Sequence, residues 1–81
     1  RIIRIVFDGK SSNEPVIANL VLEFKAQVNI LFADLKEINE KSFGHMVVQL
    51  PEDKDLSDKI IYYLRNIIKV NVEELIDYVA S

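Results

Sequence analysis

The chain has 81 residues, of which 49% are hydrophobic and 28% charged, a balance typical of one small folded domain and not of a disordered segment. Its net charge of −3 provides no basic surface for phosphate backbones, so nucleic acid is not an expected partner. With no cysteine it has no disulfide framework and no thiol nucleophile. We expect a single domain over residues 1–81, and the opening on Arg1, directly before an apolar segment, predicts a module excised from a longer chain.

The first half of the chain predicts a strand, a helix and a second strand. Residues 2–7 form a short segment rich in β-branched residues, and Gly9 ends it. Pro15 then stands in the first turn of a helix over residues 15–26, because apolar residues recur there at i, i+3, i+4 and i+7. These residues are Ile17, Leu20, Val21 and Phe24. Strict alternation over residues 28–38 predicts the second strand.

The second half of the chain predicts a hairpin partner and a second helix. Turn residues over 39–44 precede another alternating segment, 45–50, which Pro51 ends, so the two strands are expected to form a hairpin. An acidic stretch over residues 52–55 supplies an N-cap and offsets the helix dipole. The apolar stripe of this helix is Leu56, Ile60, Ile61, Leu64 and Ile68.

The closing segment decides the fold class. Val70 and Val72 alternate as in a strand, whereas the spacing from Val72 to Val79 also suits a helix. We predict a strand from about Lys69, because a third helix would leave an uneven three-stranded sheet. The resulting order is β-α-β-β-α-β, an α+β ferredoxin-like fold with two helices on one face of a four-stranded antiparallel sheet.

The other face of that sheet is expected to be covered by a partner. Alternation directs one set of side chains toward the helices: Ile3, Ile5, Phe7, Leu31, Ala33, Leu35, Met46, Val48 and Leu50. It leaves on the opposite face Val6, Ile30, Phe32 and Val47. Apolar side chains gathered on an open face predict association, and scattered exposure is the alternative. We expect a homodimer whose interface contains Ile30, Phe32, His45 and Val47.

Several segments together resemble one known family. The tripeptide Asn29-Ile30-Leu31, at the start of the predicted second strand, is the one after which the NIL domain is named. The chain is similar to that family over nearly its whole length, with one departure of about a residue in the stretch 74–77. The other matching segments are Phe7-Asp8-Gly9, Pro15, Phe43-Gly44-His45-Met46, Val70-Asn71-Val72-Glu73 and Tyr78-Val79.

The resemblance implies a non-catalytic, ACT-like regulatory domain in the ATPase subunit of a methionine ABC importer. In that family two copies pair, bind methionine at or near their interface and inhibit import when internal methionine is plentiful. The implied location is the cytoplasmic side of the cell membrane, through a transmembrane permease subunit that partners the parent chain. A pure dimerisation module without a ligand, or a NIL domain beside a ferredoxin module, are the alternatives.

The ligand-binding residues are predicted around the tripeptide. The amide of Asn29 offers donors and an acceptor, which suits the α-amino and α-carboxylate groups of an amino acid. A strand-start cap is the alternative role for this asparagine. The apolar contacts to a thioether side chain are predicted to come from Ile30, Leu31, Phe32 and Met46.

Other motifs are not expected to carry chemistry. Gly9-Lys10-Ser11 imitates the end of a phosphate-binding loop, but Arg4 stands where that motif needs its first glycine. His45 has no companion at metal-ligand spacing, and Glu73 and Glu74 are adjacent strand residues that point to opposite faces. We therefore predict no catalytic residue, no metal and no cofactor.

Overall fold

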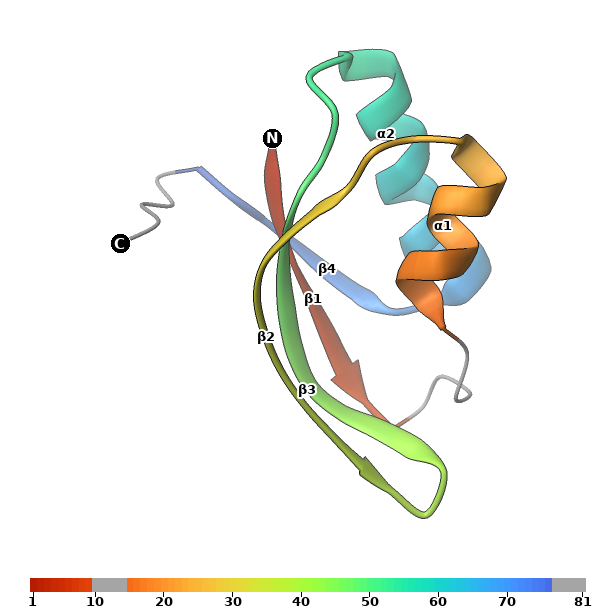
Figure 1. The fold of residues 1–81 in the computed structure, drawn as a ribbon, viewed down its shortest axis with the longest axis vertical. Helices are drawn as coiled ribbons and strands as arrows, with labels where there is room; N and C mark the ends of the chain where they lie inside the picture. The colour runs from red at the N-terminus through yellow and green to blue at the C-terminus, as the bar shows by residue number, and fades with distance from the viewer. Residues whose placement is uncertain (10–14, 77–81) are drawn as a thin grey trace.

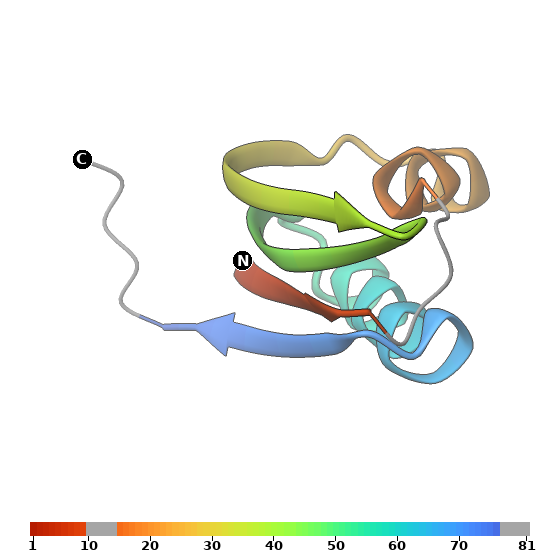
Figure 2. The ribbon, with the colours of Figure 1, turned by 90° about the horizontal axis from the view of Figure 1, so that it is seen from below.

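The computed structural model describes residues 1–9 and 15–76 and has the predicted element order. The four strands form one antiparallel sheet in the order β2-β3-β1-β4, and both helices lie on the same side of it (Figures 1 and 2). The predicted α+β ferredoxin-like fold is therefore confirmed. The elements are β1 (Ile2–Asp8), α1 (Val16–Phe24), β2 (Asn29–Ile38), β3 (Lys41–Gln49), α2 (Lys54–Tyr62), the π-helix η1 (Tyr63–Ile68) and β4 (Asn71–Leu75).

The core lies between the sheet and the helices. Alternate residues of β1 are buried there, as the period of two predicts, and the inner face of α2 packs against them. In α1 the first residue of the helix, Val16, is buried, whereas Val21 is 37% exposed. The buried face of the helix therefore includes Val16 in place of the predicted Val21. The fully buried large side chains of this core are Ile3, Ile5, Leu20, Ile60, Leu64 and Val48.

The β2–β3 hairpin turns earlier than the sequence predicts. Asn39 and Glu40 form a two-residue turn with φ of 51° and 65°, the left-handed geometry that suits the twist of a hairpin. The prediction of a turn extending to Gly44 is wrong, because β3 already begins at Lys41. Gly44 instead allows two backbones to approach: at its φ of 126°, a Cβ would lie 2.0 Å from the carbonyl oxygen of Asp34.

The closing segment is a strand, as predicted, but it begins later. The second helix continues beyond Tyr62 as the π-helix η1, which ends at Lys69 in a left-handed conformation with φ 65°. β4 therefore starts at Asn71 and pairs antiparallel with β1.

Candidate functional site

A β-bulge at the start of β2 changes which side chains share a face. The register pairs Ile30 with Val48 and Phe32 with Val47, so Leu31 is an extra residue without a partner in β3. A bulge of one residue reverses the alternation on one side of it. The prediction that Ile30 lies on the open face is therefore wrong: Ile30 points toward the helices, and Leu31 no longer belongs to the regular helix-facing set.

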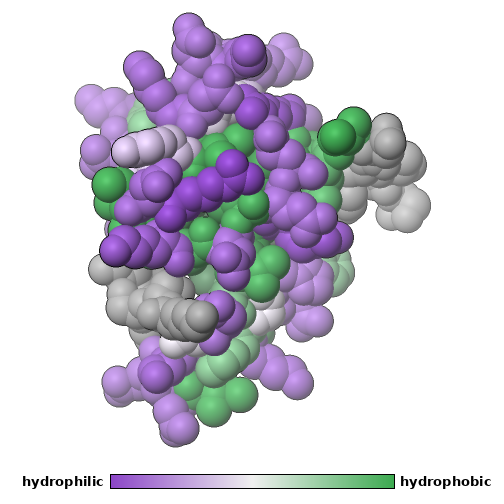
Figure 3. All heavy atoms as spheres, turned by 180° about the vertical axis from the view of Figure 1, so that it is seen from behind, coloured by the Kyte–Doolittle hydropathy of each residue, from purple (hydrophilic) through white to green (hydrophobic). Residues whose placement is uncertain are grey.

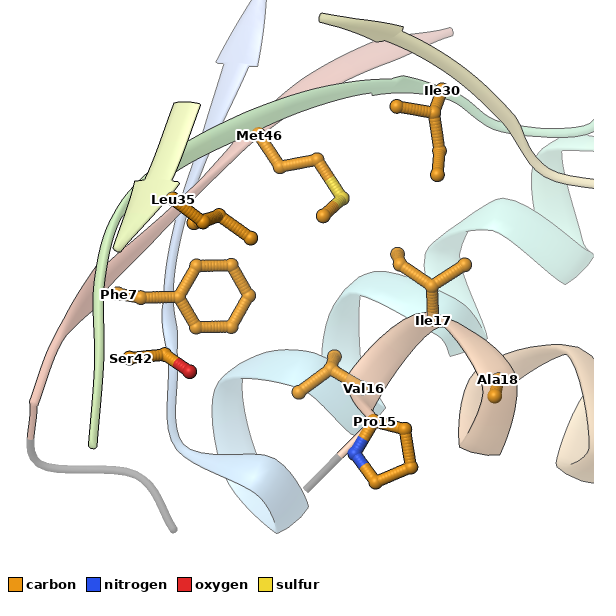
Figure 4. A pocket seen from close by; sticks show the side chains of 9 residues that line it. All are labelled: Phe7, Pro15, Val16, Ile17, Ala18, Ile30, Leu35, Ser42 and Met46. Carbon is orange, nitrogen blue, oxygen red and sulfur yellow. The ribbon is translucent and has the colours of Figure 1, made fainter. Parts of the chain in front are cut away.

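The reversed Ile30 helps to line an apolar hollow between α1 and the sheet. Figure 4 shows Ile30 and the thioether of Met46 at one end of it, with Ile17 of α1 facing them. The volume of the hollow is about 220 Å³. The lining residues are Phe7, Pro15, Val16, Ile17, Ala18, Ile30, Leu35, Ser42 and Met46. Two of the five predicted ligand contacts, Ile30 and Met46, thus come together here.

The dimensions and chemistry of this hollow suit a small apolar group. A protein cavity of roughly 150 Å³ lined by aliphatic and aromatic side chains holds a molecule of benzene size. The hollow is larger, at about 220 Å³, and its lining side chains are apolar except for the hydroxyl of Ser42. An unbranched side chain of a few heavy atoms therefore fits, and Met46 and Phe7 offer it a polarisable sulfur and an aromatic ring.

Asn29 lies elsewhere. It pairs with Gln49, which places it on the sheet face opposite to Ile30, and it lines a separate, more polar hollow of about 410 Å³ with Gln27 and Glu52. The structure therefore does not bring Asn29 and Met46 to the same hollow within one copy.

The open face of the sheet is more polar than predicted. Phe32 stacks on His45, with ring centroids 5.4 Å apart and an interplanar angle of 27°, and remains 47% exposed. Val47, beside it, is only 3% exposed within a single copy. An ion pair of 3.2 Å joins Arg4 of β1 to Glu73 of β4. The predicted apolar patch thus has fewer exposed members than its sequence indicates.

The rear of the molecule shows the same mixture of side chains. In Figure 3 hydrophobic atoms show between hydrophilic side chains and form no open expanse. This view therefore offers no broad apolar surface of the kind that marks a stable interface.

A second group of charges fastens the start of β1 to α2 and β4. The guanidinium of Arg1 donates from Nε to the carboxylate of Glu74 at 2.6 Å, and its Nη1 pairs with Asp58 and donates to the hydroxyl of Ser57. The hydrogen bonds to these two carboxylates hold the pKa of Arg1 above its ordinary value, and the larger effect comes from Glu74. None of these residues lines the apolar hollow, and their contacts join the start of the chain to α2 and β4.

The remaining motifs have no site in the described part of the chain. Lys10 and Ser11 of the Gly9-Lys10-Ser11 motif fall outside the described residues. Within residues 1–9 and 15–76 no group of three or more histidine, cysteine, aspartate or glutamate side chains could hold a metal ion. In the same ranges no helix is both long and apolar enough to cross a bilayer.

Sequence reasoning missed most of the lining of the hollow. Phe7 and Leu35 were predicted to face the helices, but their alternation does not say that a space remains between them and α1. Ile17 was predicted only as part of the helix stripe, and Ser42 was placed in a turn. The sequence feature that points to this lining is Pro15, because it fixes where α1 begins and therefore which of its residues approach the sheet.

The chain matches the model of the family described as "NIL domain" over residues 1–74. It is 42% identical over 71 residues to the methionine import ATP-binding protein MetN 2 of Acinetobacter baylyi, covering 86% of this chain and 21% of that protein. The corresponding protein of Helicobacter pylori strain 26695 is 35% identical over 74 residues, covering 91% of this chain and 22% of its own length. The chain thus spans about a fifth of the curated relatives that it matches.

Among solved structures, the C-terminal domain of an ABC transporter/ATP-binding protein from Enterococcus faecalis superposes on this chain with a TM-score of 0.79 and 25% sequence identity. The superposition covers 90% of this chain and 80% of that one.

Proposed function

The chain belongs to the NIL domain family, and we propose that it is a methionine-binding regulatory domain of the ATP-binding subunit of a methionine importer. The observation that carries the proposal is the apolar hollow lined by Ile30 and Met46, in a chain whose relatives are named methionine import ATP-binding proteins. The domain binds and performs no chemistry of its own.

The methionine side chain enters the hollow between α1 and the sheet. Its thioether packs among Ile30, Met46 and Phe7, where sulfur–aromatic contact and burial of methylene groups both favour it. Each buried methylene contributes about 0.8 kcal/mol, so burial of the three side-chain carbons contributes about 2.4 kcal/mol. Millimolar affinity requires about 4.1 kcal/mol in total, and the contacts of the thioether sulfur and of the polar end supply the remainder. Ser42 at the hollow and Asn29 from a paired copy are the proposed polar contacts.

Regulation follows from the difference in methionine affinity between two placements of paired domains. A ligand shifts such an equilibrium only as far as its affinities for the two states differ, and a tenfold difference is worth about 1.4 kcal/mol per site. The methionine-bound placement holds the importer inactive, with the parent chain attached to a permease subunit on the cytoplasmic side of the membrane. The proposed partner contacts on the open face are Phe32, which is exposed, and His45, which is partly exposed.

A substitution that fills the hollow tests this proposal in the parent importer. Ile17 faces Ile30 and Met46, so Ile17→Phe places a ring where the ligand side chain would lie (Figure 4). We expect import by this variant to continue at internal methionine levels that stop the unaltered importer. Val21→Phe is the matched control, because Val21 lies one turn along α1, is 37% exposed and does not line the hollow. Equal inhibition in the two variants would contradict the proposal, provided that both keep their melting temperature.

A further inference from the structure

Met46 is the one methionine of the chain, and its sulfur faces the apolar hollow. Figure 4 shows the thioether between Ile30 and Ile17, at the end of the hollow away from Ser42. The chain has no cysteine and no tryptophan, so this sulfur is the group that a mild oxidant attacks first. A side chain that lines the candidate site is therefore also the most readily oxidised one in the chain.

The hollow gives small solutes a path to that sulfur. Its lining includes Pro15 and Ala18, which are exposed, and Ile30 and Leu35, which are 49% and 40% exposed. Its volume of about 220 Å³ is far larger than the roughly 30 Å³ that one water molecule occupies in the liquid, so a peroxide with two heavy atoms fits. Met46 belongs to the core and is only 8% exposed, so an oxidant reaches its sulfur through the hollow.

We propose that Met46 is an oxidation site that controls the affinity of the hollow for an apolar side chain, with hydrogen peroxide as the oxidant. A lone pair of the thioether sulfur attacks one peroxide oxygen, so that an S–O bond forms and the O–O bond breaks. The departing hydroxide takes the proton of the transferred hydroxyl group, and the products are methionine sulfoxide and water. The sulfur loses the two electrons that the peroxide gains, so the reaction needs no further reactant.

The sulfoxide oxygen changes the hollow at the point where the ligand side chain would pack. Oxidation converts a flexible apolar side chain into a polar one. While the hollow is empty, water can hydrate this oxygen, but an entering thioether or alkyl group expels the water and donates no hydrogen bond in its place. The hydroxyl of Ser42 lies beside Phe7, at the other end of the hollow (Figure 4). A polar atom buried without a partner is costly, so oxidation of Met46 opposes binding.

This inference deepens the proposed function by assigning a regulation of the same site, and to that extent it rests on the proposed function. Methionine in the hollow covers the sulfur of Met46 and slows its oxidation, whereas oxidation weakens the binding of methionine. In the parent importer, oxidation of Met46 therefore relieves the inhibition by internal methionine, and import continues in the presence of peroxide. The oxidation site itself depends only on the geometry of the hollow.

The rate of oxidation tests whether the hollow exposes the sulfur. The 81-residue chain is treated with hydrogen peroxide without methionine, and mass spectrometry of its peptides follows the addition of one oxygen. Two reference variants combine Met46→Leu with a methionine elsewhere on α1: Leu22→Met at a position 75% exposed, and Leu20→Met at a fully buried position that does not line the hollow. Exchange of leucine and methionine nearly conserves volume, so both variants should fold.

The unaltered chain should oxidise at a rate close to that of the exposed reference. We expect Met46 to react within about tenfold of the Leu22→Met variant and at least about tenfold faster than the Leu20→Met variant, because exposure of the sulfur controls the rate. Methionine at saturating concentration should slow the reaction of Met46 and leave that of the Leu22→Met variant unaltered, since residue 22 lies outside the hollow.

Calorimetry measures the effect of oxidation on the ligand. We expect the sulfoxide to raise the dissociation constant of methionine roughly tenfold or more, while the melting temperature stays within about 5 °C of the unoxidised value. Treatment with the methionine sulfoxide reductases, one for each sulfoxide epimer, should restore the original affinity. Met46→Leu is the matched control, because peroxide should not change whatever affinity this variant has.

Three results would overturn the inference. The first is oxidation of Met46 as slow as that of the buried reference, and the second is a methionine affinity that oxidation does not change. The third is loss of cooperative melting on oxidation, because the damage would then be to the core and not to the site. A chain that oxidises rapidly at Met46 but binds no methionine before treatment would contradict the proposed ligand and leave the oxidation site in place.

Discussion

Gly44→Ala is expected to destabilise the fold more than any other single methyl addition in the hairpin. The new Cβ would lie 2.0 Å from the carbonyl oxygen of Asp34 and 3.1 Å from Cα of Leu35, and both are backbone atoms that cannot rotate away. The φ of 126° adds strain of about 1–3 kcal/mol for a residue with a Cβ. Relief requires β2 to move from β3, so we expect a total loss of at least about 3 kcal/mol, within the range reached by backbone strain and broken packing.

Thermal and urea unfolding followed by circular dichroism measure this loss. For a domain of this size each kcal/mol corresponds to about 4–8 °C, so the melting temperature should fall by at least about 12 °C. Gly9→Ala is the comparison, because its Cβ would meet the ring of Phe43 at 2.5 Å, a side chain that can move. Its loss should be smaller, and Phe43→Ala should remove part of it. A loss below about 0.5 kcal/mol for Gly44→Ala, typical of a neutral surface change, would refute the account of the hairpin.

Three further outcomes are expected. Glu40→Gly should stabilise the domain by about 0.5–1 kcal/mol in urea melts, because Glu40 holds a φ of 65° in a turn that favours Asn-Gly; unchanged or reduced stability would contradict that turn geometry. Asn29→Ala should weaken methionine binding by about 1–3 kcal/mol in calorimetry if Asn29 of a paired copy is a polar contact, and an unaltered affinity would make it a strand-start residue only. Arg1→Gln should lower stability equally at neutral and mildly alkaline pH. The raised pKa of Arg1 means that its contribution is complete below the unfolded-state pKa and is lost only when pH rises through the folded value, so a loss confined to neutral pH would contradict this.

The regular parts of the fold could be predicted from the sequence because their patterns are local. The alternation of β1 and the stripe of α2 identify the buried residues directly, and both are confirmed. The boundaries of the hairpin were not predictable in the same way. Asn39 and Gly44 are both typical turn residues, and only the close approach of β2 to Gly44 shows that this glycine belongs within a strand.

The candidate site was harder to predict for a specific physical reason. The alternation of side chains was extended without interruption through Asn29-Ile30-Leu31, whereas a bulge adds a residue there and reverses Ile30. Periodicity carries no sign of such a bulge, because it depends on how two strands meet. The hollow is a property of four elements together, α1, β1, β2 and β3, and no local pattern in any one of them determines its volume.

Calorimetric titration of methionine into the 81-residue chain tests the central claim most directly. We predict a saturable heat of binding at one site per copy, lost in Ile17→Phe and retained in Val21→Phe. The two variants distinguish binding in the hollow from binding elsewhere on the surface. Both add a ring to α1, but of the two positions only residue 17 lines the hollow. No heat of binding at millimolar methionine, or equal binding by the two variants, would contradict the claim that this hollow receives methionine.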